Sequence, residues 1–357
     1  MMKKIFIMLV CILISYSANA QGTIVSALYE NMSGLQQNYH SVWSSSSTDT
    51  HTYIAGPSSD NPNTSWAANQ MFIAKYKNTD MSLDSAVTFN FNGYPYFVEE
   101  VSGELYIGGI LYDGKWRGFI YVLNMSYKIV RSYKFNPNIL PYDFTIDAAG
   151  DIYAIGSRWG QGYDVFIRKF NSSLIPVGTP DLVLAGSGND YGWDIKQNGS
   201  DIYIAGYTKD GFNAYPKNFS GDSYFVARYD KNSAIPTINA QDFIYVGGSG
   251  NEFYNDIDIV INGNNLYLGA GTESIDMPNP VNALKGDADA FVSMIDISPG
   301  KFEVEAKGDK PDREEIVATL TRAEKVLKAV PGTVTAALPV GKLLGDALIW
   351  CGKMGWM

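Results

Sequence analysis

The chain alternates short apolar runs with clusters of Gly, Asn, Asp and Ser over most of its length. The clearest repeat is an apolar–Tyr–apolar run that ends at or beside glycine, and its five copies span residues 52–56, 105–109, 152–156, 202–206 and 266–270. Each copy is followed, after a loop, by a second apolar run, at residues 71–76, 119–123, 166–170, 225–229 and 291–295. The runs are β-branched and aromatic and too short for helices, so they predict strands.

Two further strands complete each repeat. One precedes the tyrosine strand and often reaches it through a tight turn such as Asn198-Gly199. The other lies earlier and ends in a glycine-rich turn, as at residues 182–186 and 243–247. Four antiparallel strands that recur about every 45–60 residues are typical of a β-propeller, whose sheets, or blades, bury their faces against one another. The sequence therefore predicts an all-β fold, a five-bladed propeller of four-stranded antiparallel blades.

The ends of the repeat region predict how the ring closes. Residues 23–28 resemble the strand that ends in a glycine turn, yet no earlier blade exists for them to complete. The last repeat ends near Ile295 and lacks that strand. We therefore expect residues 23–28 to form the outermost strand of the fifth blade, which removes an exposed sheet edge. The alternative is that residues 302–305 take this place.

Several stretches of the fourth and fifth repeats resemble a known repeat family. They read GSGNDYGWDI from Gly186, DIYIAGYT from Asp201, GDSYFVARYD from Gly221 and GDADAFVSMID from Gly286. They look like the β-propeller repeat abbreviated SBBP, which occurs in secreted and surface proteins of bacteria and archaea. The resemblance covers about residues 181–296 and weakens toward the amino end. It implies a propeller on a secreted protein, and it carries no catalytic residues over to this chain.

The amino end predicts export. Lys3 and Lys4 precede an apolar run at residues 5–14, and Ala18-Asn19-Ala20 is a small-x-small cleavage site. Residues 1–20 are therefore predicted to be a signal peptide that is too short for a membrane span. We expect a secreted or cell-surface protein, with the periplasm also possible.

Residues 301–357 differ in kind from the predicted propeller at residues 21–300. They contain no Asn, Ser, Tyr, Gln or His, and apolar residues recur at helical spacing between residues 311 and 328. A second apolar stretch at 334–350 is interrupted by charges, which predicts a helical tail without a transmembrane span that could contact a membrane interface. Two explanations stay open: an appended helical module, or an error of reading frame or gene model.

The charge disfavours one class of partner, nucleic acid, and the cysteine content leaves no disulfide within the mature chain. Residues 21–300 hold 16 Lys and Arg against 29 Asp and Glu, and so acidic a body disfavours nucleic acid as a partner. Once the leader is removed, Cys351 is the only cysteine, so no disulfide within the chain is expected.

Metal and triad chemistry are poorly supported. The two histidines, His40 and His51, cannot supply a zinc site or a Ser-His-Asp arrangement. The acid pairs at 256/258 and 287/289 offer oxygens to calcium, but residues at turns and strand ends more often cap backbone amides. We expect no metal and no cofactor.

Aromatic residues in the loops between second and third strands are the predicted ligand-binding residues. In a propeller these loops gather on one face, and exposed flat rings stack on sugars. The residues are Trp66, Tyr112, Trp116, Trp159, Tyr163, Phe212 and Tyr215. The alternative is that they pack between blades, which is the role expected of the strand tyrosines Tyr53, Tyr106, Tyr153, Tyr203 and Tyr267.

Two functions follow from this reading. The leading hypothesis is a non-enzymatic module for recognition, adhesion or structure, which binds a glycan or a surface protein; its oligomeric state stays open. The alternative is a polysaccharide hydrolase or lyase, because propellers host enzymes too. That alternative needs two or more carboxylates that converge in the central channel. The candidates near strand ends are Asp164, Asp190, Asp194, Glu252 and Asp256.

Overall fold

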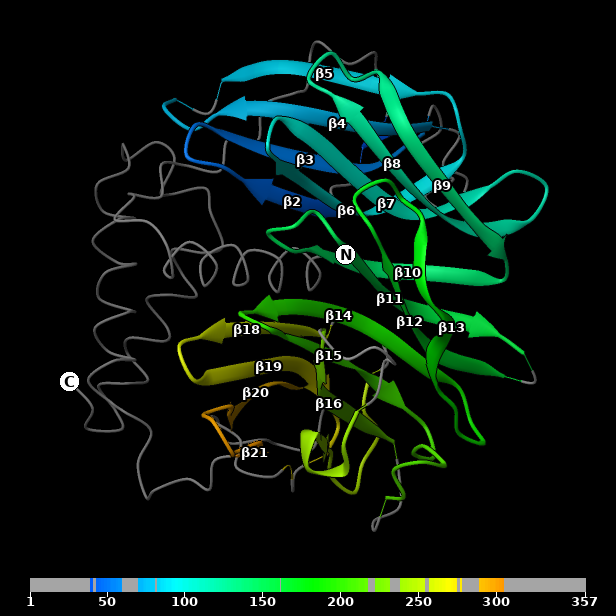
Figure 1. Cartoon of the computed structure of the whole chain (residues 1–357), viewed down its shortest axis with the longest axis vertical. Helices are drawn as coiled ribbons and strands as arrows, with labels where there is room; N and C mark the ends of the chain where they lie inside the picture. The colour runs from blue at the N-terminus through cyan, green and yellow to red at the C-terminus, as the bar shows by residue number, and fades with distance from the viewer. Residues whose placement is uncertain are drawn as a thin grey trace.

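The computed structural model describes residues 39–40, 43–59, 70–80, 82–160, 162–217, 222–231, 238–253, 257–274, 277 and 289–304. These residues form five antiparallel sheets that follow one another in chain order, from the first at the top of Figure 1 to the fifth at the lower left. Within the described residues the only helix is a single 3-10 turn, η1 (Ala240–Asp242). The five sheets fit the predicted five-bladed propeller.

The strands have the following bounds. The first sheet holds β1 (Tyr39–His40), β2 (Ser44–Ser47), β3 (His51–Ser59), β4 (Gln70–Lys77) and β5 (Leu83–Phe89). The second holds β6 (Gly93–Val101), β7 (Glu104–Tyr112), β8 (Trp116–Asn124) and β9 (Ile129–Pro137). The third holds β10 (Ile139–Ile146), β11 (Ile152–Trp159), β12 (Tyr163–Phe170) and β13 (Pro176–Leu184). The fourth holds β14 (Asp190–Asn198), β15 (Asp201–Thr208), β16 (Ser223–Asp230) and β17 (Phe243–Val246). The fifth holds β18 (Asp258–Asn262), β19 (Asn265–Thr272), β20 (Asp289–Asp296) and β21 (Glu303–Val304).

The inner strands β2, β6, β10, β14 and β18 bring neighbouring sheets together, since each contacts the next in this order. Three of them skip one residue in their pairing with the second strand, at Tyr96 in β6, Tyr142 in β10 and Trp193 in β14. Such a β-bulge bends the strand and re-aims the side chain of the extra residue. The same irregularity therefore recurs at the same place in three consecutive sheets.

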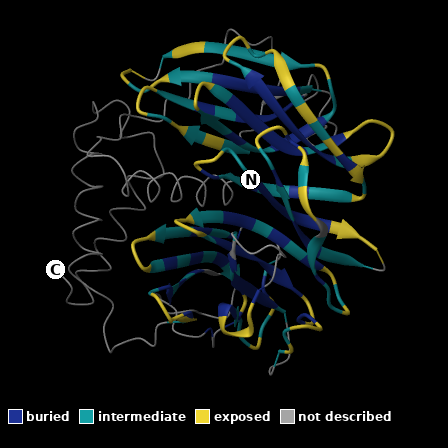
Figure 2. Cartoon of the chain, viewed as in Figure 1, coloured by how far each residue is buried: buried dark blue, intermediate teal, exposed yellow. Residues whose placement is uncertain are grey.

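The core consists of four hydrophobic clusters among the described residues, one between each pair of consecutive sheets. Figure 2 shows this as dark blue along the middle strands and yellow at turns and outer edges. The strand tyrosines Tyr53, Tyr106, Tyr153 and Tyr203 are buried, as predicted. Tyr267 is only half-buried, because burial alternates along β19 and the face that carries Tyr267 is the less covered one.

The outer strand of the fifth sheet comes from the carboxyl side. Ile295 and Asp296 of β20 pair with Val304 and Glu303 of β21, which is the alternative that the sequence left open. Residues 23–28, predicted to take that place, lie outside the described residues, as does the predicted signal peptide. The helical tail predicted over 301–357 finds no support, because its described part ends in β21 and the rest lies outside the described residues. No helix in the described part of the chain is long and apolar enough to cross a membrane.

Candidate functional site

A chain of aromatic rings runs around the centre of the molecule. Trp43, just before β2, and the three bulge residues Tyr96, Tyr142 and Trp193 each come from a different sheet. The ring centroids are 5.3 Å apart for Trp43–Tyr96, 5.6 Å for Tyr96–Tyr142 and 4.4 Å for the stacked pair Tyr142–Trp193. All four side chains are half-buried. The indole N–H of Trp193 has no hydrogen-bond partner among the described residues, although it is buried.

In three sheets, the residue that directly follows the central aromatic residue in sequence makes a hydrogen bond to the next sheet. Its side chain accepts from a backbone N–H of the inner strand of that next sheet. These bonds are Val98 N–H to Ser44 Oγ (3.0 Å), Ile195 N–H to Asp143 Oδ2 (3.1 Å) and Ile259 N–H to Asp194 Oδ2 (2.6 Å). Asp143 and Asp194 are thereby fixed next to the rings of Tyr142 and Trp193.

Lys196 lies among these carboxyl groups. Its Nζ is 2.5 Å from Asp194 Oδ1 and 3.4 Å from Asp143 Oδ2. Burial alone would lower the pKa of the Lys196 ammonium, but the charges of Asp143, Asp194 and Asp258 outweigh burial and raise that pKa well above its ordinary value. Lys196 therefore carries a fixed positive charge in the centre.

The two aspartates on either side of this lysine differ in protonation. Burial raises the pKa of Asp143 well above its usual range, and the negative charge of Asp194 adds to the effect. Burial acts on Asp194 too, but the charge of Lys196 and hydrogen bonds from Asp258 and Asp143 outweigh it and lower its pKa. The pKa values of the two carboxyl groups thus move in opposite directions, with that of Asp143 raised and that of Asp194 lowered.

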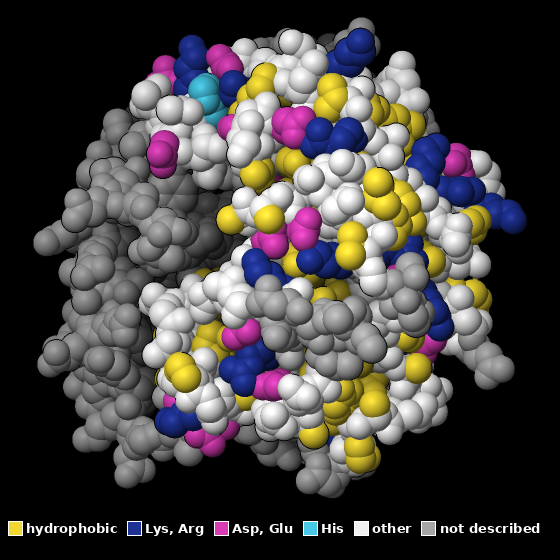
Figure 3. Space-filling model, viewed as in Figure 1, with side chains coloured by type: hydrophobic (Ala, Val, Ile, Leu, Met, Phe, Trp, Pro, Cys, Tyr) yellow, Lys and Arg dark blue, Asp and Glu magenta, His cyan; other side chains and the backbone are white. Residues whose placement is uncertain are grey.

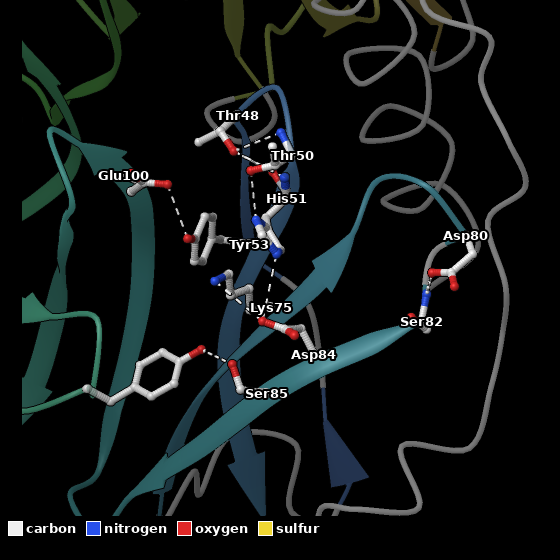
Figure 4. Close-up of polar contacts among 11 residues, drawn as sticks. Thr48, Thr50, His51, Tyr53, Lys75, Asp80, Ser82, Asp84, Ser85 and Glu100 are labelled. Carbon is white, nitrogen blue, oxygen red and sulfur yellow. Dashed lines mark hydrogen bonds and ion pairs between the residues drawn. The ribbon is translucent and has the colours of Figure 1, made fainter.

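Glu99 is a further carboxyl group that interacts with the charge of Lys196. It lies on β6 opposite Tyr106, and burial raises its pKa to about 7, an effect that the charge of Lys196 partly opposes. Among the described residues, no group hydrogen-bonds to its carboxyl. The adjacent Glu100 differs, since it accepts a hydrogen bond from the Tyr53 hydroxyl at 3.1 Å (Figure 4). Glu99 can thus hold a proton near neutral pH with its oxygens free for a ligand.

This arrangement suits acid–base chemistry. A protonated carboxyl, an ionised carboxylate and a fixed cation lie together beside aromatic rings, and paired carboxyl groups with separated pKa values are what glycosidic bond cleavage uses. Within the described residues, no group of three or more His, Cys, Asp and Glu side chains is arranged to hold a metal ion.

Two of the acids predicted from the sequence hold turns. Asp190 and Glu252 are buried at equivalent places, opposite Thr208 and Thr272, after the sequences GSGN in both sheets. Glu252 Oε1 accepts from the Gly248 amide (2.9 Å) and the Ser274 hydroxyl (2.8 Å). Burial raises the pKa of Asp190 to about 7 and that of Glu252 above its usual value. The Glu252 carboxyl thus holds a turn, and Asp190 lies buried at the equivalent turn of the fourth sheet, at the other end of its strand from Lys196.

The remaining predicted acids lie in different places. Asp164 is half-buried opposite Arg158 at the start of β12; burial raises its pKa, and the charge of Arg158 partly opposes this. Asp256 lies outside the described residues. Of the four candidates that the structure describes, Asp194 lies in the central cluster, while Asp143 and Glu99 were not predicted. The signal that could have revealed Asp143 is the repeated aromatic–Asp pair in Tyr142-Asp143 and Trp193-Asp194.

The predicted loop aromatics also divide. Tyr112, Trp116 and Trp159 are exposed, with 47%, 37% and 52% of their surface accessible. Tyr163 is half-buried and lies 4.7 Å from Trp159 between ring centroids. Trp66 lies outside the described residues. These positions leave Tyr112, Trp116, Trp159 and Tyr163 available for a ligand.

Phe212 and Tyr215 pack against other aromatic rings of the fourth sheet. Phe212 is buried against Phe225 and Phe243 because its loop folds back onto the fourth sheet. Tyr215 lies parallel to the ring of Phe243, with centroids 4.4 Å apart, and its hydroxyl donates to the Ile238 carbonyl at 2.5 Å. Both residues pack the edge of the sheet.

His51 belongs to a polar network in the first sheet. Its Nδ1 lies 2.8 Å from Thr50 Oγ1 and its Nε2 lies 3.7 Å from Asp84, which also pairs with Lys75 at 3.4 Å (Figure 4). Thr50 is exposed in the turn before β3. The network ties β3, β4 and β5 together. Nothing is described for the side chain of His40.

Comparison with known proteins gave no family model and no curated protein that matches this chain. Solved structures do match, at low identity. An exo-1,5-α-L-arabinanase from a bovine ruminal metagenomic library is 13% identical, with 73% of this chain and 95% of that chain covered and a TM-score of 0.39. A compost-metagenome β-xylosidase/α-arabinofuranosidase in complex with xylotriose is 12% identical, with coverage of 76% and 96% and a TM-score of 0.41. Drosophila Plexin A in complex with Semaphorin 1b is 12% identical, with coverage of 73% and 52% and a TM-score of 0.40.

These matches correct the leading hypothesis from the sequence. Several of them are glycoside hydrolases, so the prediction of a non-enzymatic module is withdrawn. At these identities and TM-scores the similarity assigns no reaction or substrate to this chain. The resemblance to the SBBP repeat has no matching family model behind it.

Proposed function

We propose that the protein hydrolyses glycosidic bonds of a polysaccharide at the centre of the propeller. The observation that carries this proposal is the environment of Lys196, where ionised Asp194 and protonated Asp143 meet near Glu99, whose pKa is about 7. A proton donor and an ionised carboxylate are the two groups that glycoside hydrolysis requires.

Each side chain then has one role. Glu99 donates its proton to the bridging oxygen as the bond from the sugar carbon to that oxygen breaks. Asp194 is the carboxylate that activates water or attacks the sugar carbon. In either case a water molecule completes the reaction, and the oxygen atom of that water ends up on the sugar carbon. Lys196 and the proton held on Asp143 keep Asp194 ionised. The rings of Tyr142 and Trp193 offer flat faces to the sugar.

We also propose that this activity is exported from the cytoplasm. The basic and apolar pattern of residues 1–20 and the resemblance of residues 181–296 to the SBBP repeat support export. A carbohydrate partner agrees with similar structures that were solved with xylose or xylotriose.

The test is release of new reducing ends from xylan, arabinan, mixed-linkage glucan and polygalacturonate by the purified chain. Glu99→Gln keeps the shape but cannot donate a proton, so its rate should fall by about 10²–10⁴-fold. Glu100→Gln is the matched control on the same strand. A wild-type chain that releases reducing ends from none of the four polymers would contradict the proposal.

A further inference from the structure

Four aromatic side chains form an exposed surface beside the central site, which we call the aromatic platform: Tyr112, Trp116, Trp159 and Tyr163. They come from two hairpins, β7–β8 of the second sheet and β11–β12 of the third. Their rings touch within each hairpin, at 5.3 Å for Tyr112–Trp116 and 4.7 Å for Trp159–Tyr163. A folded protein seldom leaves several large rings exposed side by side unless they bind something.

The two hairpins are held against each other through one residue. The Asn138 amide donates to the Trp116 carbonyl at 3.1 Å, and the Asn138 carbonyl accepts from the Trp159 amide at 2.9 Å. Asn138 adopts a φ of 70°, a left-handed conformation that Asn tolerates better than most residues. Because backbone bonds fix both tryptophans, the platform is preorganised rather than a set of independent loop tips.

The platform is continuous with the rings of the centre. On each side one further tyrosine completes the connection. The contacts are Trp116–Tyr94 at 5.7 Å and Tyr94–Trp43 at 4.9 Å on one side, and Tyr163–Tyr191 at 5.2 Å and Tyr191–Trp193 at 6.2 Å on the other. A chain molecule bound on the platform can therefore continue onto rings next to Asp194.

Two basic side chains near the platform, Arg117 and Lys134, are paired with one carboxylate. Arg117 Nε lies 2.9 Å from Asp113, and Lys134 Nζ lies 3.3 Å from the same carboxylate. Elsewhere too, basic and acidic side chains lie next to one another on the face in Figure 3. Paired ions leave little attraction for an acidic polymer. The available contact is ring stacking, which suits the flat faces of neutral sugars.

We infer that the aromatic platform binds a neutral, linear polysaccharide chain and leads one of its internal bonds to the central site. The inference rests on the proposed function for the chemistry, but binding on the platform can be measured without cleavage. The platform thus determines how affinity and kcat/KM depend on the length of the substrate, and it takes no part in the chemical step.

The experiment compares the double variant Trp116→Ala/Trp159→Ala with Ile175→Ala, an exposed apolar residue of the β12–β13 turn. All chains carry Glu99→Gln to suppress turnover, and affinity electrophoresis in xylan, arabinan, mixed-linkage glucan or polygalacturonate gives the dissociation constant. Loss of two stacking rings should weaken binding of a neutral polymer at least about 10-fold, with Ile175→Ala unchanged. Equal affinity of the two variants, or binding of polygalacturonate alone, would overturn the inference.

A second readout separates this inference from the proposed function. In chains with Glu99 intact, Trp116→Ala/Trp159→Ala should lower kcat/KM about 10-fold on the polymer and change it less than about 2-fold on a short aryl glycoside. Equal losses on both substrates would contradict a platform role. If no chain cleaves either substrate while the platform variants still lose polymer binding, the proposed reaction fails and the platform stands.

Discussion

Asp190 and Asp194 lie four residues apart on the same inner strand, and both are buried, yet their pKa values move in opposite directions. At the turn end of the strand, burial raises the pKa of Asp190 to about 7, and the charge of Asp164 adds to the effect. At the centre, Lys196 lies 2.5 Å from Asp194 and lowers its pKa despite equal burial. Burial alone therefore does not distinguish a working carboxylate from a structural one, whereas a fixed cation beside it does.

Equivalent positions in the different sheets also separate structural acids from acids of the central site. The turn acid recurs, as Asp190 in one sheet and Glu252 in the next, because each sheet needs the same turn held. The residue opposite the strand tyrosine does not recur: it is Glu99 in the second sheet, Thr145 in the third, Lys196 in the fourth and Val260 in the fifth. Glu99 and Lys196 therefore occupy a position whose residue type is not fixed by the repeat.

The largest difference should appear in turnover. Asp194→Asn keeps the hydrogen-bond acceptor for the Ile259 amide but removes the negative charge, so kcat on a polysaccharide should fall about 10³-fold. Asp190→Asn should keep kcat within about 3-fold, because its carboxyl holds a turn. Steady-state rates of the two variants, with circular dichroism to confirm folding, check this. Equal losses would remove the distinction between the two ends of the strand.

A second prediction concerns the pH dependence of kcat. Glu99 must be protonated to act as an acid, and its pKa is about 7, so activity should fall as the pH rises above about 7. Asp194 must be ionised, and its lowered pKa keeps it so through the weakly acidic range. A rate profile from pH 4 to 9 should therefore show a fall above about pH 7 and no loss at the acidic end from protonation of Asp194. Activity that stays constant to pH 9 would exclude Glu99 as the proton donor.

The smallest effect concerns stability. The pKa of Asp190 is about 7 in the folded chain and near 3.8 in an unfolded one, so the folded state binds the proton more tightly. Its contribution to the free energy of unfolding is therefore full below pH 3.8 and falls as pH rises toward 7, by at most about 1.4 kcal/mol per pH unit. Urea unfolding between pH 4 and 8 should show a shallower decline for Asp190→Asn than for wild type. The exposed acid of Asp210→Asn is the control, and identical slopes would contradict a buried, protonated Asp190.

Local patterns predicted the scaffold well. Apolar runs of strand length place the five tyrosine strands, and the same period puts Tyr53, Tyr106, Tyr153 and Tyr203 in the core. Loop position alone misjudged Phe212, because the loop folds back and buries the ring against Phe243.

The central site depends on contacts that no local pattern encodes. Lys196 and Asp143 are 53 residues apart in sequence, and the Ile259–Asp194 hydrogen bond spans 65 residues. The bulges that place Tyr96, Tyr142 and Trp193 around the centre lie in hairpins of consecutive strands, but the apolar pattern does not show which residue is skipped in the pairing. The sequence also does not show that Glu99 and Glu100 have different surroundings, because this depends on which face of β6 each side chain lies on.

Glu99 and Glu100 also provide the most direct test. The initial rate of reducing-end release should be measured for wild type, Glu99→Gln and Glu100→Gln on the polymer that the wild-type chain cleaves best. The account predicts a fall of about 10²–10⁴-fold for Glu99→Gln and a rate close to wild type for Glu100→Gln, whose carboxyl only accepts the Tyr53 hydroxyl. A Glu99→Gln chain that cleaves the polymer as fast as wild type would contradict it.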